Sequence, residues 1–175
     1  MRIAISGTHR VGKSTLIDDL EELLPSYRTI AEPYYHLEEE GYEFAGEPSI
    51  EDYIEQFQYS IALLGEGEPD ALFDRCPADF LGYLRVHPDS ETVDLEEWLS
   101  QVRGALRTLD LIVFVGIEHH DRVVLPRSEN AAFRSYVDEA LRTILLEDEF
   151  NFGVEILEVH GDRKARVNQV LQRIR

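Results

Sequence analysis

The most specific chemical pattern lies near the start of the chain, at residues 7–14. This segment reads Gly-Thr-His-Arg-Val-Gly-Lys-Ser and fits G-x-x-x-x-G-K-[ST] at every fixed position. Its two glycines permit backbone angles that a Cβ forbids, so the loop can turn successive N–H groups inward as an anion nest. An apolar run precedes the loop and a helical pattern follows it, which adds the positive end of a helix dipole. The sequence therefore predicts a site for the phosphates of a nucleoside triphosphate, the P-loop or Walker A motif.

Individual positions of this loop have expected roles. Lys13 places its charge on the β- and γ-phosphates, and Ser14 is the expected Mg²⁺ ligand, with Thr15 behind it. His9 and Arg10 fill variable positions and are expected in solvent, although Arg10 is able to reach phosphate. We expect ATP and Mg²⁺ as cofactors, bound by Gly7, Thr8, His9, Arg10, Val11, Gly12, Lys13, Ser14 and Thr15.

Short apolar runs alternate with longer amphipathic stretches along the rest of the chain. The apolar runs predict five strands, at residues 2–6, 27–31, 71–74, 111–117 and 154–159. Helical spacing predicts helices near residues 13–24, 49–65, 80–86, 94–106, 130–146 and 163–174. Strands separated by helices pair in parallel through right-handed crossovers. The predicted fold class is a three-layer α/β domain, with about five parallel strands flanked by helices, in a single unit spanning residues 1–175.

The composition excludes several classes of function. The chain has 175 residues, with 35 acidic against 17 basic side chains, and only Lys13 and Lys164 are lysines. This balance argues against a nucleic-acid-binding face and against binding to an anionic membrane. The lone Cys76 excludes a disulfide framework, and the absence of a signal peptide before the first strand predicts a cytoplasmic protein. The acidic, lysine-poor composition fits either a salt-rich cytoplasm or a genome that favours arginine codons.

Polar side chains follow three further predicted strands. Glu32-Pro33-Tyr34-Tyr35 follows the second strand, Asp74-Arg75 the third, and an irregular segment at residues 118–128 the fourth. Open parallel sheets bind ligands beyond the carboxyl ends of their strands, so we expect these residues around the phosphate loop. Asp74 also follows three apolar residues, as an acid that holds Mg²⁺ at the end of a buried strand would.

In order and spacing, these features resemble the nucleoside and nucleotide kinase branch of P-loop proteins, which includes deoxynucleoside kinases, thymidylate kinases and related small ATP-binding proteins. The resemblance covers most of the chain and implies roles for three residues. Glu32 would be the base or the orienting group for the acceptor hydroxyl. Asp74 would hold Mg²⁺ through water, and Arg75 would grip the acceptor phosphate or the transferring phosphoryl group.

The same resemblance implies a lid at about residues 118–130. Its Arg122 and Arg127 would close over the β- and γ-phosphates, while Arg134 would make a second lid contact or an ion pair. Arg163 follows the last strand, where related folds pack a loop on the adenine. The residues expected to bind the acceptor are Tyr34 and Tyr35, whose rings can stack on a base, and Gln58, which occupies the place of a base-reading glutamine.

The expected acceptor pocket departs from both kinase groups. Cys76 stands where deoxynucleoside kinases usually carry a hydroxyl side chain, and the tryptophan that often follows their Glu-Pro is absent. Ala31 precedes Glu32, so the Arg-Glu-Pro-Gly pattern of thymidylate kinases is absent too. The identity of the acceptor therefore stays open.

Two functions fit these patterns. The first is a small-molecule kinase that moves the γ-phosphoryl group of ATP·Mg²⁺ to a nucleoside-like or other metabolite. The second is a nucleotide-dependent NTPase switch that acts on a protein partner. The sequence carries no N-K-x-D motif for guanine, and its Glu-Pro corner and acid-Arg pair favour transfer. The expected partners are a nucleotide and a small acceptor; the amphipathic helices would allow a homodimer, which no feature requires.

Overall fold

The structure is a computed structural model that describes residues 1–118 and 130–175. The strands in this part of the chain are β1 (Arg2–Ser6), β2 (Arg28–Ile30), β3 (Ala71–Asp74), β4 (Leu111–Phe114) and β5 (Ile156–Glu158). The α-helices are α1 (Lys13–Leu23), α2 (Pro33–Glu39), α3 (Ile50–Gly65), α4 (Pro77–Val86), α5 (Leu99–Leu106), α6 (Ala131–Leu141) and α7 (Arg163–Arg173). Short 3₁₀ turns (Ser90–Thr92 and Leu95–Trp98) precede α5, and a π-helical turn (Arg142–Leu146) extends α6.

The strands form one parallel sheet in the order β2-β3-β1-β4-β5. This order places β1 at the centre, where Ile5 lies opposite Asp74 of β3 and Val113 of β4. The carboxyl ends of β1, β3 and β4 therefore meet at the same edge of the sheet. The predicted fold class, with about five parallel strands, is confirmed.

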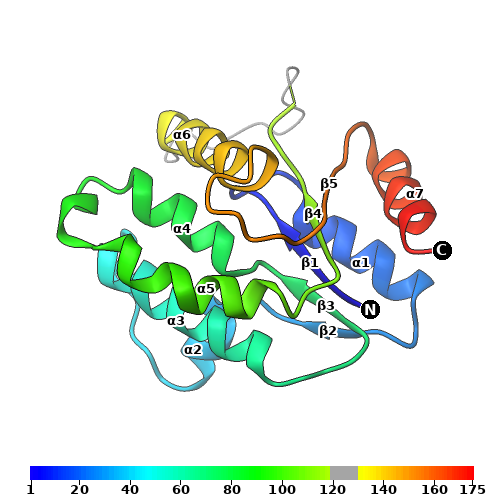
Figure 1. Cartoon of the computed structure of the whole chain (residues 1–175), viewed down its shortest axis with the longest axis horizontal. Helices are drawn as coiled ribbons and strands as arrows, with labels where there is room; N and C mark the ends of the chain where they lie inside the picture. The colour runs from blue at the N-terminus through cyan, green and yellow to red at the C-terminus, as the bar shows by residue number, and fades with distance from the viewer. Residues whose placement is uncertain (119–129) are drawn as a thin grey trace.

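Helices cover both faces of this sheet (Figure 1). Successive side chains of a strand point to opposite faces, so each strand supplies two cores. Ala4, Phe73 and Ile112 pack with the helices α3–α6, whereas Ile3, Ile5, Leu72 and Val113 pack with α1 and α7. The result is the three-layer arrangement that the alternating pattern predicts.

Local sequence explains where several helices begin. Ser49 and Asp52 form the predicted capping box of α3, with each side chain accepting a hydrogen bond from the backbone of the other residue. The helix α2 was not among the predicted helices; it begins at Pro33, directly after Glu32, because proline is well suited to the first helical position. None of the helices in the described ranges has the length and apolar character needed to span a membrane.

We predict that adding a methyl group at Gly82 destabilises the contact between α4 and α6. A Cβ there would lie 2.9 Å from Cδ2 of the fully buried Leu141, which is too close for a packed core. Gly82→Ala should lower the free energy of unfolding by about 1–3 kcal/mol, the usual cost of overpacking. Gly104→Ala is the matched control, because that helical glycine has open space around its Cβ position. Urea denaturation should show the control variant as stable as the wild type or slightly more so, and equal loss in both variants would contradict the prediction.

Candidate active site

The predicted phosphate loop connects β1 to α1 at residues 7–12. Gly12 has a φ of 93° and forms the N-cap of α1, while Gly7 has a φ of 146°. A Cβ on Gly7 would lie 2.2 Å from the carbonyl oxygen of Val115, so only glycine fits between β1 and the segment after β4. The loop thus lies against the N-terminus of α1, where the first N–H groups have no acceptor within the helix.

Two cations hold the first carbonyl groups of the loop. Nη1 of Arg75 donates to the carbonyl oxygen of Gly7 at 3.2 Å. Nζ of Lys13 donates to that of Thr8 at 2.8 Å. A trans peptide places its C=O and N–H on opposite sides, so a bond that holds the carbonyl group also fixes the direction of the amide of that peptide.

Two arginines from distant helices hold the next three carbonyl groups. Arg134 of α6 donates through Nε to His9 at 3.0 Å and through Nη2 to Arg10 at 3.1 Å. Arg166 of α7 donates through Nη1 to Val11 at 2.7 Å. The sequence suggested a lid contact or an ion pair for Arg134; the structure shows that its guanidinium bonds to the loop backbone. Donors from distant parts of the chain therefore hold the loop backbone.

Asp79 is a fully buried carboxylate that anchors the start of the loop. Its Oδ1 accepts from the backbone N–H of Gly7 at 2.8 Å, and its Oδ2 accepts from that of Cys76 at 3.0 Å. Nη1 of Arg75 lies 3.6 Å from the same Oδ1. Sequence reasoning missed this residue, although its place three positions after the N-cap of α4 is a capping signal.

Arg75 connects the ends of β3 and β2 through its contact with Glu32. It has a φ of 77°, a costly left-handed conformation for a residue other than glycine, directly after β3. Its Nε lies 2.6 Å from Oε2 of Glu32, and its guanidinium lies 5.3 Å from the ring centre of Tyr83. The ion pair and the ring contact orient the Glu32 carboxylate beside the phosphate loop.

Asp74 and Ser14 are the predicted magnesium ligands, and both lie beside the phosphate loop. Asp74 ends β3, and its Oδ1 is buried without a hydrogen-bond partner in the described residues. Burial raises the pKa of this carboxyl group, and the nearby Lys13 opposes that shift. Ser14 is exposed in the first turn of α1. The described residues hold no cluster of three metal-ligating side chains. The orphaned carboxylate oxygen of Asp74 and the hydroxyl of Ser14 are oxygen donors of the kind that Mg²⁺ accepts beside phosphate and water.

Lys13 is the most strongly perturbed cation of the loop. Burial, followed by the charge of Arg75, lowers its pKa from 10.5 to about 8, while Asp79, Asp74 and Glu32 act in the opposite direction. Only 6% of the residue is exposed. Burial makes the charged form of this ammonium group unfavourable, so a bound anion would stabilise the charged form strongly.

A large cavity of ≈ 740 Å³ opens on one side of the loop. Its walls combine charged groups with aromatic rings, which suits a flat, ring-bearing ligand. Two of its polar residues, Glu32 and Arg75, are among the predicted catalytic residues. The cavity is also lined by His9, Tyr34, Tyr53, Gln56, Tyr83, Asn130 and Phe133.

The structure brings only some of the predicted acceptor residues to this cavity. Tyr34 lines it, but Tyr35 is 53% exposed and Gln58 lies on the exposed side of α3, so neither of them lines it. Gln56 takes the inward position instead, because two residues rotate a helix by about 200°. The structure thus brings Gln56, and not the predicted Gln58, to this cavity.

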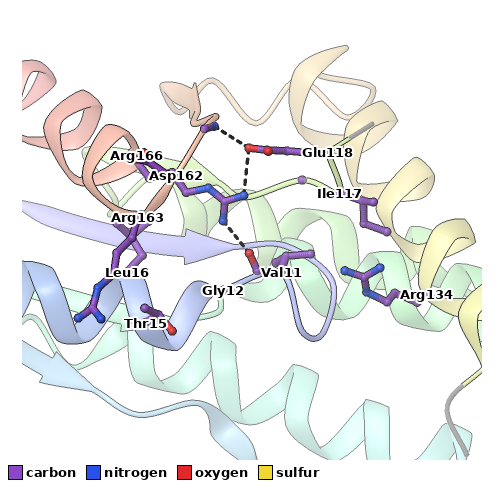
Figure 2. Close-up of a pocket in the computed structure, with 12 residues that line it drawn as sticks. Val11, Gly12, Thr15, Leu16, Ile117, Glu118, Arg134, Asp162, Arg163 and Arg166 are labelled. Atoms are coloured by element: carbon purple, nitrogen blue, oxygen red, sulfur yellow. Dashed lines mark hydrogen bonds and ion pairs between the residues drawn. The ribbon is translucent and has the colours of Figure 1, made fainter. Parts of the chain in front are cut away.

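A smaller cavity of ≈ 210 Å³ lies on the other side of the loop, against Gly12 and Thr15 (Figure 2). Arg163 lines it, and its guanidinium pairs with Asp19 of α1 at 2.6 Å. Arg166 lies deeper in the same wall, and sequence reasoning missed it. Oε1 of Glu118 accepts from Nη2 of Arg166 at 3.1 Å and from the N–H of Gly161 at 2.6 Å, which ties the end of β4 to α7.

The predicted lid falls mostly outside the described residues, and Arg122 and Arg127 are among those not described. Its two ends are described. Glu118 belongs to the smaller cavity, and Asn130 caps α6 by accepting from the N–H of Phe133. The roles of the two arginines stay predictions.

Comparisons with known proteins identify the family and the fold. A family model described as "AAA domain" matches residues 2–166, and the chain belongs to that family. None of the curated proteins gives a match in sequence.

Solved structures share the fold across nearly the whole chain. A deoxyadenosine kinase from M. mycoides with bound dATP is similar, with a TM-score of 0.68, 16% identity, and 99% of this chain and 98% of that chain covered. A thymidylate kinase from Candida albicans has a TM-score of 0.64 and 17% identity, with 98% and 89% covered. The fold is therefore that of the P-loop nucleoside and nucleotide kinases.

The lowered pKa of Lys13 predicts how nucleotide binding depends on pH. Phosphate attracts the charged ammonium, and the charged fraction in the empty protein falls above a pKa of about 8. The Kd for MgATP should stay flat below that pH and then rise by up to about tenfold per pH unit. Calorimetric titration of the wild type and Lys13→Arg measures this, because arginine stays charged and should give a flat profile. A wild-type Kd that is unchanged up to about pH 9.5 would contradict the prediction.

Proposed function

We propose that this protein transfers the γ-phosphoryl group of ATP, with Mg²⁺, to a hydroxyl or phosphate of a small nucleoside-like metabolite. The phosphates would occupy the loop, and the donor base would occupy the ≈ 210 Å³ cavity beside Arg163. The acceptor would occupy the ≈ 740 Å³ cavity beside Glu32. Related folds support this: one solved deoxyadenosine kinase binds dATP, and another structure of that enzyme holds the products dCMP and dCDP.

One observation carries the proposal: the phosphate loop is shared by two cavities. Val11 and Gly12 line the smaller cavity, whereas the side chain of their neighbour His9 reaches the larger one and lies 3.3 Å from the hydroxyl of Tyr83. A nucleotide switch has no need of a second ligand cavity against its phosphate loop. A phosphotransferase has to hold two ligands on either side of the transferring group.

The residues around the loop supply what phosphoryl transfer requires. Lys13 and the loop amides would neutralise the phosphate oxygens as charge redistributes between donor and acceptor. Glu32, fixed by Arg75, would orient the acceptor hydroxyl and take its proton. Ser14 and Asp74 would hold Mg²⁺, which supplies charge stabilisation for the bridging phosphate oxygens.

The first prediction of this proposal concerns Glu32. A panel of nucleosides, nucleoside monophosphates and small alcohols should contain an acceptor that raises ADP formation above the acceptor-free rate. Glu32→Gln should lower the acceptor-dependent rate of ADP formation by about 10²-fold or more, since the amide cannot accept the hydroxyl proton. Exposed Glu21→Gln on α1 is the control and should behave as the wild type.

ADP formation that is equal with every acceptor and unaffected by Glu32→Gln would contradict the proposal. In that case the Glu-Pro corner would be structural, and an NTPase acting with a protein partner would become the better account.

The second prediction uses the two glutamines of α3 as a matched pair. Gln56 lines the larger cavity and is buried, with its amide NH₂ group donating to the carbonyl oxygen of Asp52 at 3.1 Å, which leaves its amide oxygen for a ligand. Gln56→Leu should raise the acceptor KM by about tenfold, because a polar group of the ligand would lose its hydrogen-bond partner. The Kd for MgATP should stay unchanged. Gln58→Leu, on the exposed side, should change neither. Equal effects of the two variants on the acceptor KM would overturn the assignment.

A further inference from the structure

The phosphate loop contains one strained residue that is not glycine. Arg10 has a φ of 54°, in the left-handed region, and its side chain is exposed. This conformation costs free energy for all residues other than glycine, and the cost is smaller for asparagine and aspartate than for the rest. Such a residue persists only where the surrounding structure holds it in place.

The residue that holds it is on a distant helix. Arg134 of α6 is 2% exposed, and its guanidinium donates to the carbonyl groups of His9 and Arg10 at 3.0 and 3.1 Å. These two carbonyls belong to the peptides on either side of the Arg10 Cα. A single rigid, planar group therefore fixes both peptide planes that define the left-handed turn, which the single ammonium point of lysine cannot do in the same geometry. Figure 2 shows Arg134 directed from α6 toward this loop.

The same turn of α6 also borders the acceptor side. Phe133, next to Arg134 in the chain, and Asn130 line the larger cavity, whereas Arg134 lines the smaller one. The first turn of α6 thus contacts both ligand cavities and the loop between them. A shift of this turn would move the loop backbone as well as the acceptor wall.

We propose that Arg134 is a positioning residue that keeps the phosphate loop in its binding conformation by holding the left-handed turn at Arg10. The proposal rests on the proposed function, because it takes the loop as the site for the phosphates of ATP. Arg134 acts here through the backbone of the loop. A direct contact between its guanidinium and the nucleotide is the competing explanation, and the experiment below separates the two.

The test is a double-mutant cycle read by calorimetric titration with MgATP. In the wild-type background, Arg134→Gln should raise the Kd by about tenfold or more, because the loop loses both hydrogen bonds. In an Arg10→Gly background the same substitution should raise the Kd by no more than about threefold, because glycine adopts the left-handed turn without support. The Kd of Arg134→Lys for MgATP should lie between the values of the wild type and Arg134→Gln.

Arg85→Gln is the matched control. Arg85 forms its ion pair with Glu149 at 2.7 Å and lines neither cavity, so this variant should bind MgATP as the wild type does. An unchanged Kd in Arg134→Gln would overturn the proposal. An equal rise in both backgrounds would also overturn it, because that result is expected when Arg134 contacts the nucleotide directly.

A further measurement needs no substitution and applies even where Arg134→Gln does not fold. In the nucleotide-free wild type, the Nε–H of Arg134 should give a resolved NMR resonance protected from solvent exchange, since Arg134 is 2% exposed and this group donates to the carbonyl of His9. Exchange as fast as that of a free arginine would contradict the proposal. Failure of the proposed function is distinct from these outcomes: an NTPase would still bind MgATP and show the same pattern of Kd values, but it would form ADP at the same rate with every acceptor.

Discussion

The site depends on how the carbonyl groups of the phosphate loop are held. From Gly7 to Val11, each carbonyl oxygen accepts a hydrogen bond from the side chain of a lysine or arginine. The donors come from the start of α1, the end of β3, α6 and α7, so every layer of the fold contributes. These bonds also fix the directions of the loop amides, because the C=O and N–H of a trans peptide point opposite ways. The central position of β1 in the sheet makes this possible, because it brings the other strand ends and both helix layers within reach of one loop.

This arrangement requires conformations and charges that are unfavourable by themselves. Arg10 and Arg75 adopt left-handed backbone angles, and Lys13 is buried with a pKa lowered to about 8. The two apolar cores above and below the sheet supply the rigidity that keeps these groups in place. A loop strained and charged in this way is prepared for an anion, and preparation before binding is the main contribution a protein makes to phosphoryl transfer.

The sequence predicted those parts of the protein that local patterns determine. The alternation of apolar runs and helical stretches gave the three-layer fold, and the glycine and lysine spacing gave the loop from Gly7 to Ser14. Contacts that form only after the chain has folded carry no such signal. The capping position of Asp79 does not show that it accepts from Gly7, and no local pattern shows that Arg134 and Arg166 bond to the loop backbone. Gln58 shows a different limit of sequence analysis. A match of only two residues does not determine which side of a helix faces the cavity, and in the structure Gln56 occupies the inward position. Strand order, which decides which carboxyl ends meet, was not readable either.

The central claim is that two ligands meet across this loop and exchange a phosphoryl group. Phosphorus NMR of the protein with ATP, Mg²⁺ and one acceptor at a time tests it most directly, because it follows the γ-phosphorus itself. The account predicts that, with one acceptor, this signal is replaced by that of a phosphorylated acceptor, with ADP formed in equal amount. Inorganic phosphate as the sole new product, formed at the same rate with every acceptor, would contradict it.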